Sequence, residues 1–402
     1  MRISTNTIFQ QGITSMQRQQ TDLVKTQQQL STGNRILTPA DDPVAAARVL
    51  QLEQARGTNE QYATNRGTAN SALGQEEGVL QSINTLLQDV RTTAVYAGNP
   101  TLTNSDRAIL ATELESRFRE LLGLANSTDG TGLYLFSGYQ GSTQPYSGTI
   151  GSVTYSGDQG QRLVQVGATR QMPVSDAGSE LFDRIRTGNG TFLATANAAN
   201  TGAGIVSPGA VVDTTALTGY TYEIQFTVAA GVTTYDIVDT TNSTTVSTGN
   251  AYTAGSAITV GGMQVTIDGA PENGDKFSLA PSSSQSVFDT IGDLINAVRT
   301  PATGAAGSAR LTNSLNVALS NLDLALDRVS SVRADLGARM HELDSLDSLG
   351  SDLSLQYDKT ISQLKDLDYA SAVSDLARQQ LLLQAAQQTF AKVTGMSLFD
   401  FL

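Results

Sequence analysis

Apolar residues recur every seven positions near the start of the chain. Phe9, Met16, Leu23 and Leu30 are separated by polar stretches in which glutamine is frequent. A seven-residue apolar repeat places one narrow apolar seam along a helix, which is typical of coiled-coil pairing. Gly33 follows the last of these residues, and glycine commonly ends helices. The pattern therefore predicts a first helix that ends just before Gly33.

A second helix is predicted to begin at Pro43. Asp42 is a favourable N-cap, and proline suits the first helical position because an N–H there has no partner within the helix. The apolar pattern continues to about Leu52, and a polar stretch follows through Thr64. A new seam then begins, and each of its leucines is followed three residues later by a possible partner. The pairs are Leu73 and Glu76, Leu80 and Ile83, and Leu87 and Val90. Another helix is predicted over residues 105–124.

The C-terminal quarter repeats the seven-residue spacing in two runs. The first run is Leu315, Leu322, Val329, Leu336 and Leu343, and the second is Tyr369, Leu376, Leu383 and Phe390, with Val393 three residues farther on. A helix of about 50 residues is about 75 Å long. The two ends of the chain are therefore predicted to form a long antiparallel coiled-coil rod.

The middle of the chain has a different composition and period. From about 141 to 284, glycine, serine and threonine become frequent, and Tyr222, Ile224 and Phe226 alternate with polar residues. Such alternation is typical of half-buried strands, and Asp268-Gly269 marks a turn. The low-complexity segment 187–210 is predicted to be a loop. The fold class is therefore mainly α, with a small antiparallel β domain inserted into the helical rod.

We expect three domains along this chain. Residues 1–40 and 361–402 form a terminal coiled-coil assembly domain, residues 41–140 and 285–360 a helical rod domain, and residues 141–284 an exposed β-rich domain. The terminal helices contain few bulky apolar residues, so a hairpin made of them alone gains little from burial. We therefore hypothesise that the ends fold on assembly with neighbouring copies. A coiled coil that is complete in the monomer remains an open alternative.

The seam residues at the two ends are the expected assembly interface. They are Phe9, Met16, Leu23, Leu30, Tyr369, Leu376, Leu383, Phe390 and Val393, with the first four opposite the next four. Asp42 and Pro43 are expected to act as a structural cap.

Charge and composition narrow the class of protein. The 402 residues carry a formal net charge of −13. Residues 57–402 alone contain 19 basic and 34 acidic groups, a net charge of −15, which argues against nucleic-acid binding. Cysteine is absent, which excludes disulfides, thiolate metal sites and cysteine nucleophiles. The start has no apolar core of a signal peptide and no stretch suits a membrane span, so we expect neither a cleaved signal peptide nor a membrane partner.

Two acidic pairs could suggest acid–base chemistry, but each has a simpler structural explanation. Asp41 and Asp42 precede a helix, where carboxylates usually cap the first turn. Glu76 and Glu77 lie within a predicted helix, one directed towards the seam and one away from it. We expect this second pair to be solvated or to lie at the edge of the seam.

No metal or cofactor motif is present. His341 is the only histidine, which rules out the usual zinc site, and we expect it on a helix surface. Asp268, Glu272 and Asp275 do not follow the twelve-residue calcium-loop spacing, so turn chemistry is the preferred explanation. The sequence therefore indicates no catalytic residue, no cofactor-binding residue, no metal ligand and no enzyme activity.

Both ends of the chain resemble the flagellin superfamily. The chain opens with MRIST, continues with QQLSTGNRI at 28–36 and DDPVAA at 41–46, has LYLFSG at 133–138, and finishes with LLQAAQQTFAKV at 382–393 and SLFDFL at 397–402. The Arg2-Ile3-Ser4 start and Pro43 after two aspartates are more similar to the hook–filament junction family than to flagellins. The resemblance covers about 60 residues at the start, about 45 at the end and a short piece near 135.

The resemblance implies a structural role in the bacterial flagellum and in swimming motility. Copies of the protein would form a ring or short helical layer between hook-associated protein 1 and the flagellin filament. The chain would be exported unfolded by the flagellar type III apparatus to the outside of the cell. Its terminal helices would line the central tube, and its C-terminal region would bind a cytosolic export chaperone.

Three rival functions remain open. A flagellin would share the fold but form the filament itself. A surface adhesin or glycan-binding protein would act through residues 141–284. A hydrolase in the same segment is the weakest rival, because no catalytic constellation stands out there.

Overall fold

The computed structural model describes residues 5–395, and the side chains of 5, 6, 8 and 393–395 lie outside this description. The chain divides into two compact units. Unit 1 comprises residues 1–64 and 345–402, and unit 2 comprises residues 65–344. Helices α2 (Pro43–Ala97) and α5 (Gly304–Lys365) contribute residues to both units.

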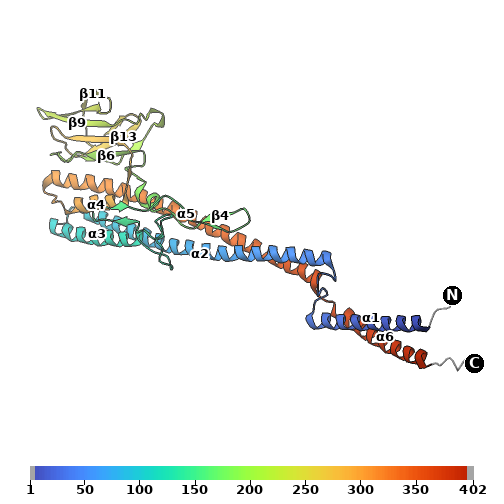
Figure 1. Ribbon diagram of the computed structural model, residues 1–402. Coiled ribbons are helices and arrows are strands. Elements are labelled where there is room, and N and C mark those ends of the chain that lie inside the picture. Colours follow the sequence, from blue (N-terminus) through green and yellow to red (C-terminus); the bar gives the residue numbers. More distant parts are fainter. Residues whose placement is uncertain (1–4, 396–402) are drawn as a thin grey trace, which may run out of the picture. The chain divides into compact units, whose positions relative to one another are not determined.

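Unit 1 contains an antiparallel pair formed by α1 (Thr5–Thr32) and α6 (Tyr369–Gly395), which lie side by side in Figure 1. Gly33 ends α1 with a φ of +71°, a conformation that glycine adopts without strain, and its N–H donates to the carbonyl of Gln29 at 2.8 Å. The predicted end of the first helix is confirmed.

The helix predictions for the rest of the chain are confirmed with one extension. α2 is a single helix of 55 residues, so the polar stretch up to Thr64 does not interrupt it. α3 covers Asn104–Ala125, close to the predicted 105–124, and begins with a capping box between Thr103 and Asp106. Sequence analysis did not single out α4 (Val287–Arg299), although this helix lies within the segment expected to be helical.

The helical seams of unit 2 are buried. Leu73, Leu80 and Leu87 of α2 have at most 1% of their surface exposed. The α5 seam from Leu315 to Leu343 is also buried at every seventh residue. α3 and α4 pack against each other beside these helices, with the rings of Phe118 and Phe288 5.9 Å apart. The seam positions therefore face a core made by more than two helices.

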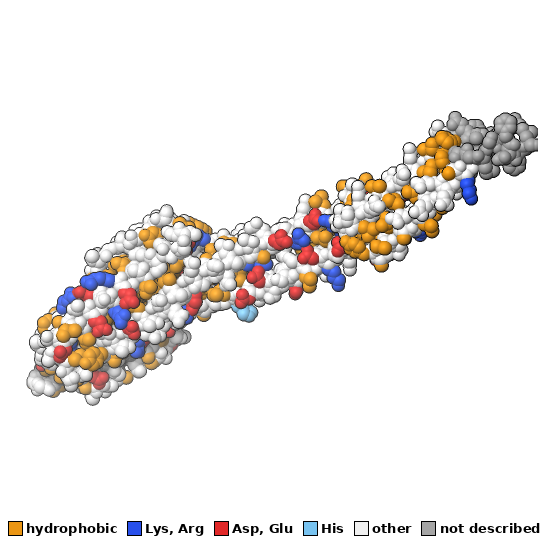
Figure 2. Space-filling view, turned by 90° about the horizontal axis from the view of Figure 1, so that it is seen from below, with side chains coloured by type: hydrophobic (Ala, Val, Ile, Leu, Met, Phe, Trp, Pro, Cys, Tyr) orange, Lys and Arg blue, Asp and Glu red, His pale blue; other side chains and the backbone are white. Residues whose placement is uncertain are grey.

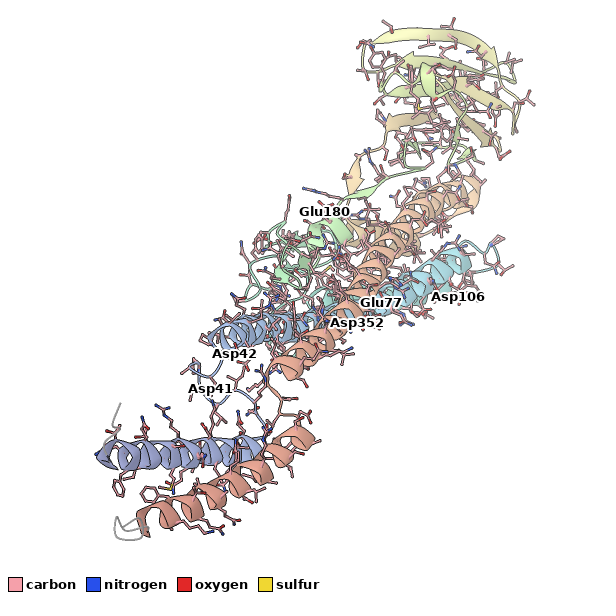
Figure 3. All side chains as sticks on the ribbon, turned by 90° about the vertical axis from the view of Figure 1, so that its right-hand side faces the viewer. Asp41, Asp42, Glu77, Asp106, Glu180 and Asp352 are labelled. Atoms are coloured by element: carbon pink, nitrogen blue, oxygen red, sulfur yellow. The ribbon has the colours of Figure 1, made fainter. Side chains whose placement is uncertain are left out.

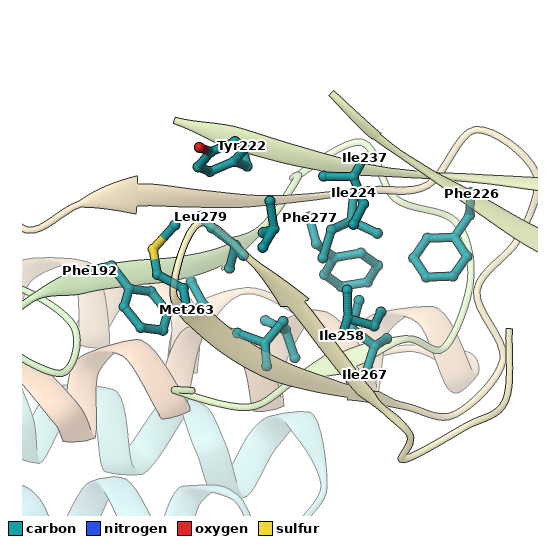
Figure 4. Packing of buried hydrophobic residues seen from close by; sticks show 14 residues of the cluster. Phe192, Tyr222, Ile224, Phe226, Ile237, Ile258, Met263, Ile267, Phe277 and Leu279 are labelled. Carbon is teal, nitrogen blue, oxygen red and sulfur yellow. The ribbon is translucent and has the colours of Figure 1, made fainter. Parts of the chain in front are cut away.

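Residues 192–281 form a β sandwich of two antiparallel sheets. The first sheet has the order β11 (Thr244–Ala251), β10 (Val232–Asp239), β9 (Tyr222–Ala229), β14 (Lys276–Pro281) and β6 (Phe192–Ala196). The second sheet contains β12 (Ala257–Val260), β13 (Met263–Asp268), β7 (Ile205–Val206) and β8 (Ala210–Val211). Figure 4 shows the apolar side chains between the sheets, including Ile224, Phe277 and Ile267.

The loop prediction for 187–210 is wrong. This segment contains β6 and β7, and β6 pairs with β14 from Phe192 opposite Pro281 to Ala196 opposite Phe277. Phe192 and Ala194 lie in the sandwich core. Strand formation here depends on a partner about 85 residues away, which a local composition signal does not contain.

Residues 141–191 do not belong to the sandwich. They form the short pairs β1 (Tyr146–Ser147) with β2 (Thr154–Tyr155) and β3 (Leu163–Gln165) with β4 (Gln171–Pro173). A π-helical turn, η1 (Ser179–Asp183), and β5 (Ile185–Arg186), which pairs with β15 (Ser284–Gln285), complete the segment. Phe136, Tyr146, Phe182 and Phe288 form an aromatic cluster with one another. This segment therefore packs on the helices.

Candidate assembly site at the terminal helix pair

The two terminal helices pack against each other, and predicted seam residues take part at both ends of the pair. The rings of Phe9 and Phe390 lie 5.1 Å apart at one end of the pair. At the other end, a Cβ atom added to Gly33 would lie 2.9 Å from the hydroxyl oxygen of Tyr369. The pairing of Met16 with Leu383, of Leu23 with Leu376 and of Leu30 with Tyr369 stays a prediction from the seven-residue spacing. The side chain of Val393 lies outside the described residues.

The seam of this pair is only partly covered. Phe9 and Tyr369 have 44% and 56% of their surface exposed, and the other described seam residues are half-buried. Gln19 and Gln379 each place a side-chain amide oxygen in the pair, where it is buried without a hydrogen-bond partner among the described residues. A buried polar atom without a partner costs free energy. The α1–α6 contact is therefore weak for its length.

Other apolar side chains of the pair also face solvent. Val24 of α1 and Val373, Leu381 and Leu382 of α6 are each about half exposed or more. Figure 2 shows hydrophobic side chains along the surface of this helix pair. Apolar residues exposed on two sides of a thin hairpin are typical of a surface that another chain covers.

The linker between α1 and α2 is held by charged groups. Asp42 Oδ1 accepts a hydrogen bond from the N–H of Ala45 at 3.0 Å, and Pro43 is the first residue of α2. Asp41 accepts from the N–H groups of Leu37 and Thr38 and pairs with Lys25 of α1 at 2.7 Å. The bonds from Lys25 and Thr38 hold the pKa of Asp41 well below its usual value. Figure 3 shows both aspartates at this linker.

The linker between α5 and α6 is hydrogen-bonded to the linker between α1 and α2. Leu367 N–H donates to Gly33 O at 2.9 Å, and Arg35 N–H donates to Lys365 O at 2.7 Å. The guanidinium of Arg35 also donates to Leu364 O at 2.7 Å and contacts Asp42. Sequence analysis missed Lys25 and Arg35, because their partners are loop groups or lie more than 300 residues away.

The histidine and the turn aspartate that the sequence singled out lie on a helix surface and in a turn. His341 is exposed on α5. Asp275 is buried and accepts from the N–H groups of Thr201, Gly202 and Glu272, so it holds a turn. Within residues 5–395, no cluster of His, Cys, Asp and Glu side chains suits a metal ion. Over the same residues, no helix is both long and apolar enough to cross a bilayer.

The expectation for Glu76 is wrong. We expected the Glu76–Glu77 pair to be solvated or at the edge of the seam, but Glu76 has only 1% of its surface exposed. The hairpin after residue 159 covers it, and no local pattern in the sequence shows that this hairpin lies there. Glu77 is half-buried and binds Arg333 of α5 at 2.6 Å.

Comparisons with known proteins identify the class. Sequence models of the bacterial flagellin N-terminal and C-terminal helical regions match residues 3–141 and 319–402. A model of the D2-like domain of flagellar hook-associated protein 1 matches residues 195–281, which is nearly the whole β sandwich. The chain therefore has the helical ends of a flagellin-type protein of the bacterial flagellum.

Full-length relatives identify the family. Flagellar hook-associated protein 3 of Salmonella typhimurium is 30% identical over 404 aligned residues, covering 100% of this chain and 99% of the relative. The crystal structure of the flagellar junction protein FlgL from Legionella pneumophila is 33% identical, with a TM-score of 0.73 over 79% of this chain and 100% of that one. The crystal structure of FlgL from Xanthomonas campestris is also 33% identical in sequence, with a TM-score of 0.71 over 77% of this chain and 99% of that one. The chain belongs to the flagellar hook-associated protein 3 family.

Flagellins are more distant. A flagellin of Clostridium tyrobutyricum is 29% identical, but over only 32% of this chain and 34% of its own length. The chain is thus a structural component of the flagellum, and the flagellin alternative is not favoured.

Proposed function

We propose that copies of this chain form the junction layer between hook-associated protein 1 and the flagellin filament. The observation that carries this proposal is the match to hook-associated protein 3 over the full length of both chains. The partly covered terminal helix pair supports it, since such a pair leaves apolar surface for neighbouring copies. The role is mechanical, so no enzyme activity is proposed.

The proposed assembly interface is the seam and the outer faces of α1 and α6. The seam residues would be fully ordered only when adjacent copies cover the pair. They are Phe9, Met16, Leu23, Leu30, Tyr369, Leu376, Leu383, Phe390 and Val393. We propose a role for each of the three predicted parts. Residues 1–40 and 361–402 would assemble, and residues 41–140 and 285–360 would support them. Of residues 141–284, the β sandwich would be the displayed part, whereas residues 141–191 pack on the helices.

The route to the flagellum is also a proposal. The chain would leave the cell unfolded through the flagellar type III apparatus without a cleaved signal peptide, and a cytosolic chaperone would bind its C-terminal region beforehand. The absence of cysteine fits such a route, because no thiol is present to oxidise outside the cell. Neither a nucleic acid nor a membrane is among the proposed partners.

The alternative of a glycan-binding surface protein has no specific support. Of the segment that would carry it, 141–284, residues 195–281 match a domain of another flagellar protein instead. Binding of a glycan by the full chain at this segment would be needed to revive it.

Deletion of the gene in the source bacterium tests the proposal. We expect cells with hooks but no filaments, flagellin released into the medium and no swimming, all restored by the intact gene. Persistence of filaments in the deletion strain would reject the junction role. If the purified chain alone grew into long filaments, the flagellin alternative would replace it.

A further inference from the structure

Glu76 is a carboxyl group inside the core of unit 2. It lies on α2 between Leu73 and Leu80, on the face that packs into the core. Its Oε1 accepts a hydrogen bond from the backbone N–H of Asp176 at 3.2 Å. Its Oε2 is buried and has no hydrogen-bond partner among the described residues. Ionisation is costly at such a position, because the charge is removed from water.

The chain that covers Glu76 is residues 159–177, here termed the hairpin segment because it contains β3 and β4. Val166 and Met172 of this segment are fully buried. Asn65 and Arg66 of α2 donate to the carbonyl groups of Gln165 and Val166 at 2.7 and 3.1 Å. The hairpin segment is therefore held on the helices by buried apolar side chains, by these polar bonds and by two ion pairs to α5, Arg170 with Glu342 at 2.6 Å and Asp176 with Arg339 at 3.0 Å.

Charged groups from the surrounding elements act on Glu76. Asp176 of the hairpin segment is the negative charge that acts on Glu76, and Arg339 of α5 binds the Asp176 carboxylate through two bonds of 3.0 Å. Arg162 of the hairpin segment is the second cation near Glu76, while the adjacent Glu77 is paired with Arg333. Burial and the charge of Asp176 raise the pKa of Glu76 to about 8, against a smaller lowering by the Asp176 N–H and the two arginines.

We propose that Glu76 is a proton-dependent switch that fixes the hairpin segment to α2 when the carboxyl is neutral and releases the segment when it ionises. The neutral carboxyl accepts the Asp176 N–H without repelling the Asp176 carboxylate. The ionised form places two negative charges at the same contact, with Arg339 already engaged by Asp176. When the segment opens, water reaches Glu76 and solvates its charge, so the free-energy cost of ionisation is removed.

The direction of the pH dependence follows from the two forms. In the open form Glu76 regains its ordinary pKa of 4.5, whereas in the closed form it is about 8. The closed form therefore binds the proton more tightly. The contribution of Glu76 to the free energy of closure is largest below pH 4.5 and decreases as the pH rises to about 8. Above that value it no longer changes with pH.

Amide hydrogen exchange on the full chain tests this switch. The reporters are the N–H groups of Val166, Val174 and Asp176, whose acceptors are Arg170 O, Arg162 O and Glu76. After correction for intrinsic exchange, we expect their protection to fall at least about tenfold between pH 6 and pH 8. In Glu76→Gln, which keeps a neutral acceptor, protection should not change with pH.

Two controls make the test decisive. Glu77→Gln removes a carboxyl at the next position and should keep the pH dependence of the wild type. Infrared spectra of the wild type should show a neutral carboxylic acid at pH 7 that disappears by pH 9, and this band should be missing from Glu76→Gln, because Asp183 and Asp293 are also carboxyl groups whose pKa is raised by burial. The proposal is overturned if the pH dependence survives in Glu76→Gln, or if the wild type shows no such acid at pH 7.

Discussion

The terminal pair α1–α6 and the seam of α2 and α5 in unit 2 have the same apolar repeat but different burial. Leu315, Leu322 and Leu336 are buried, whereas none of the seam residues of α1 and α6 whose side chains the structure describes is buried. In the described parts of unit 1, the buried apolar side chains are Ala45, Val49, Ile361 and Ala372. α3, α4 and the hairpin segment cover the helices of unit 2, whereas among the described residues of unit 1 no third helix packs along α1 and α6.

This difference shows what a seven-residue repeat means in an assembling protein. The repeat brings two helices together, but two helices bury only a narrow strip between them. A stable core needs a further layer. Unit 2 obtains that layer from its own chain, and the terminal pair is expected to obtain it from neighbouring copies.

The largest expected effect is loss of swimming in Leu383→Asp. A charge at the centre of the α1–α6 seam is costly once neighbouring copies bury it. Motility assays should show no swimming, while the main thermal unfolding transition, which reports unit 2, is unchanged. Gln384→Asp adds the same charge at the adjacent exposed position and should impair swimming far less. Normal swimming in Leu383→Asp would remove the seam from the assembly interface.

Hydrogen exchange on the purified monomer compares the two regions directly. We expect protection in the buried stretches of α2 and α5 of unit 2 to exceed that in residues 7–30 and 370–392 by roughly a hundredfold or more, because the terminal pair has no core. Equal protection in both regions would mean that the coiled coil is complete in the monomer. The polymer contacts would then lie on its outer faces only.

Matched truncations sharpen the comparison further. Leu322→Ala removes a fully buried side chain and should lower the free energy of unfolding by about 3–4 kcal/mol. Leu383→Ala, at the same repeat position of a half-buried seam, should cost about 1 kcal/mol or less in the monomer. Chemical denaturation measures both. Similar losses for the two variants would contradict the assigned difference in burial.

The smallest expected effect concerns the linker at Asp41. Its folded pKa lies below the ordinary value of 3.8, so the stability it contributes is present above pH 3.8 and is lost as the pH falls through the folded value. Asp41→Asn should slightly lower the protection of the Leu37 and Thr38 amides at pH 7, with a smaller difference from wild type below pH 3.8. Asp352→Asn, an exposed aspartate of α5, is the control and should change neither amide.

Local signals in the sequence were sufficient for much of the fold. Gly33 and the Asp42-Pro43 pair marked helix ends, because capping and backbone constraint act within a few residues. Alternation at Tyr222, Ile224 and Phe226 predicted β9 for the same reason. The motifs at both ends also predicted the family that the full-length relatives show.

Features that depend on distant partners were beyond sequence analysis. The strands of 187–210 need β14, and the burial of Glu76 needs the hairpin segment a hundred residues away. The ion pair of Lys25 with Asp41 needs the linker to fold back on α1.

The sequence by itself determined the helical and strand periods, the helix ends and the seam residues of this protein. Only the tertiary structure decided which of the equally spaced seams is buried. The physical reason is that periodicity assigns a side chain to a face of a helix, whereas burial depends on whether another segment covers that face. For α1 and α6 that segment is not among the described residues, and assembly is expected to supply it.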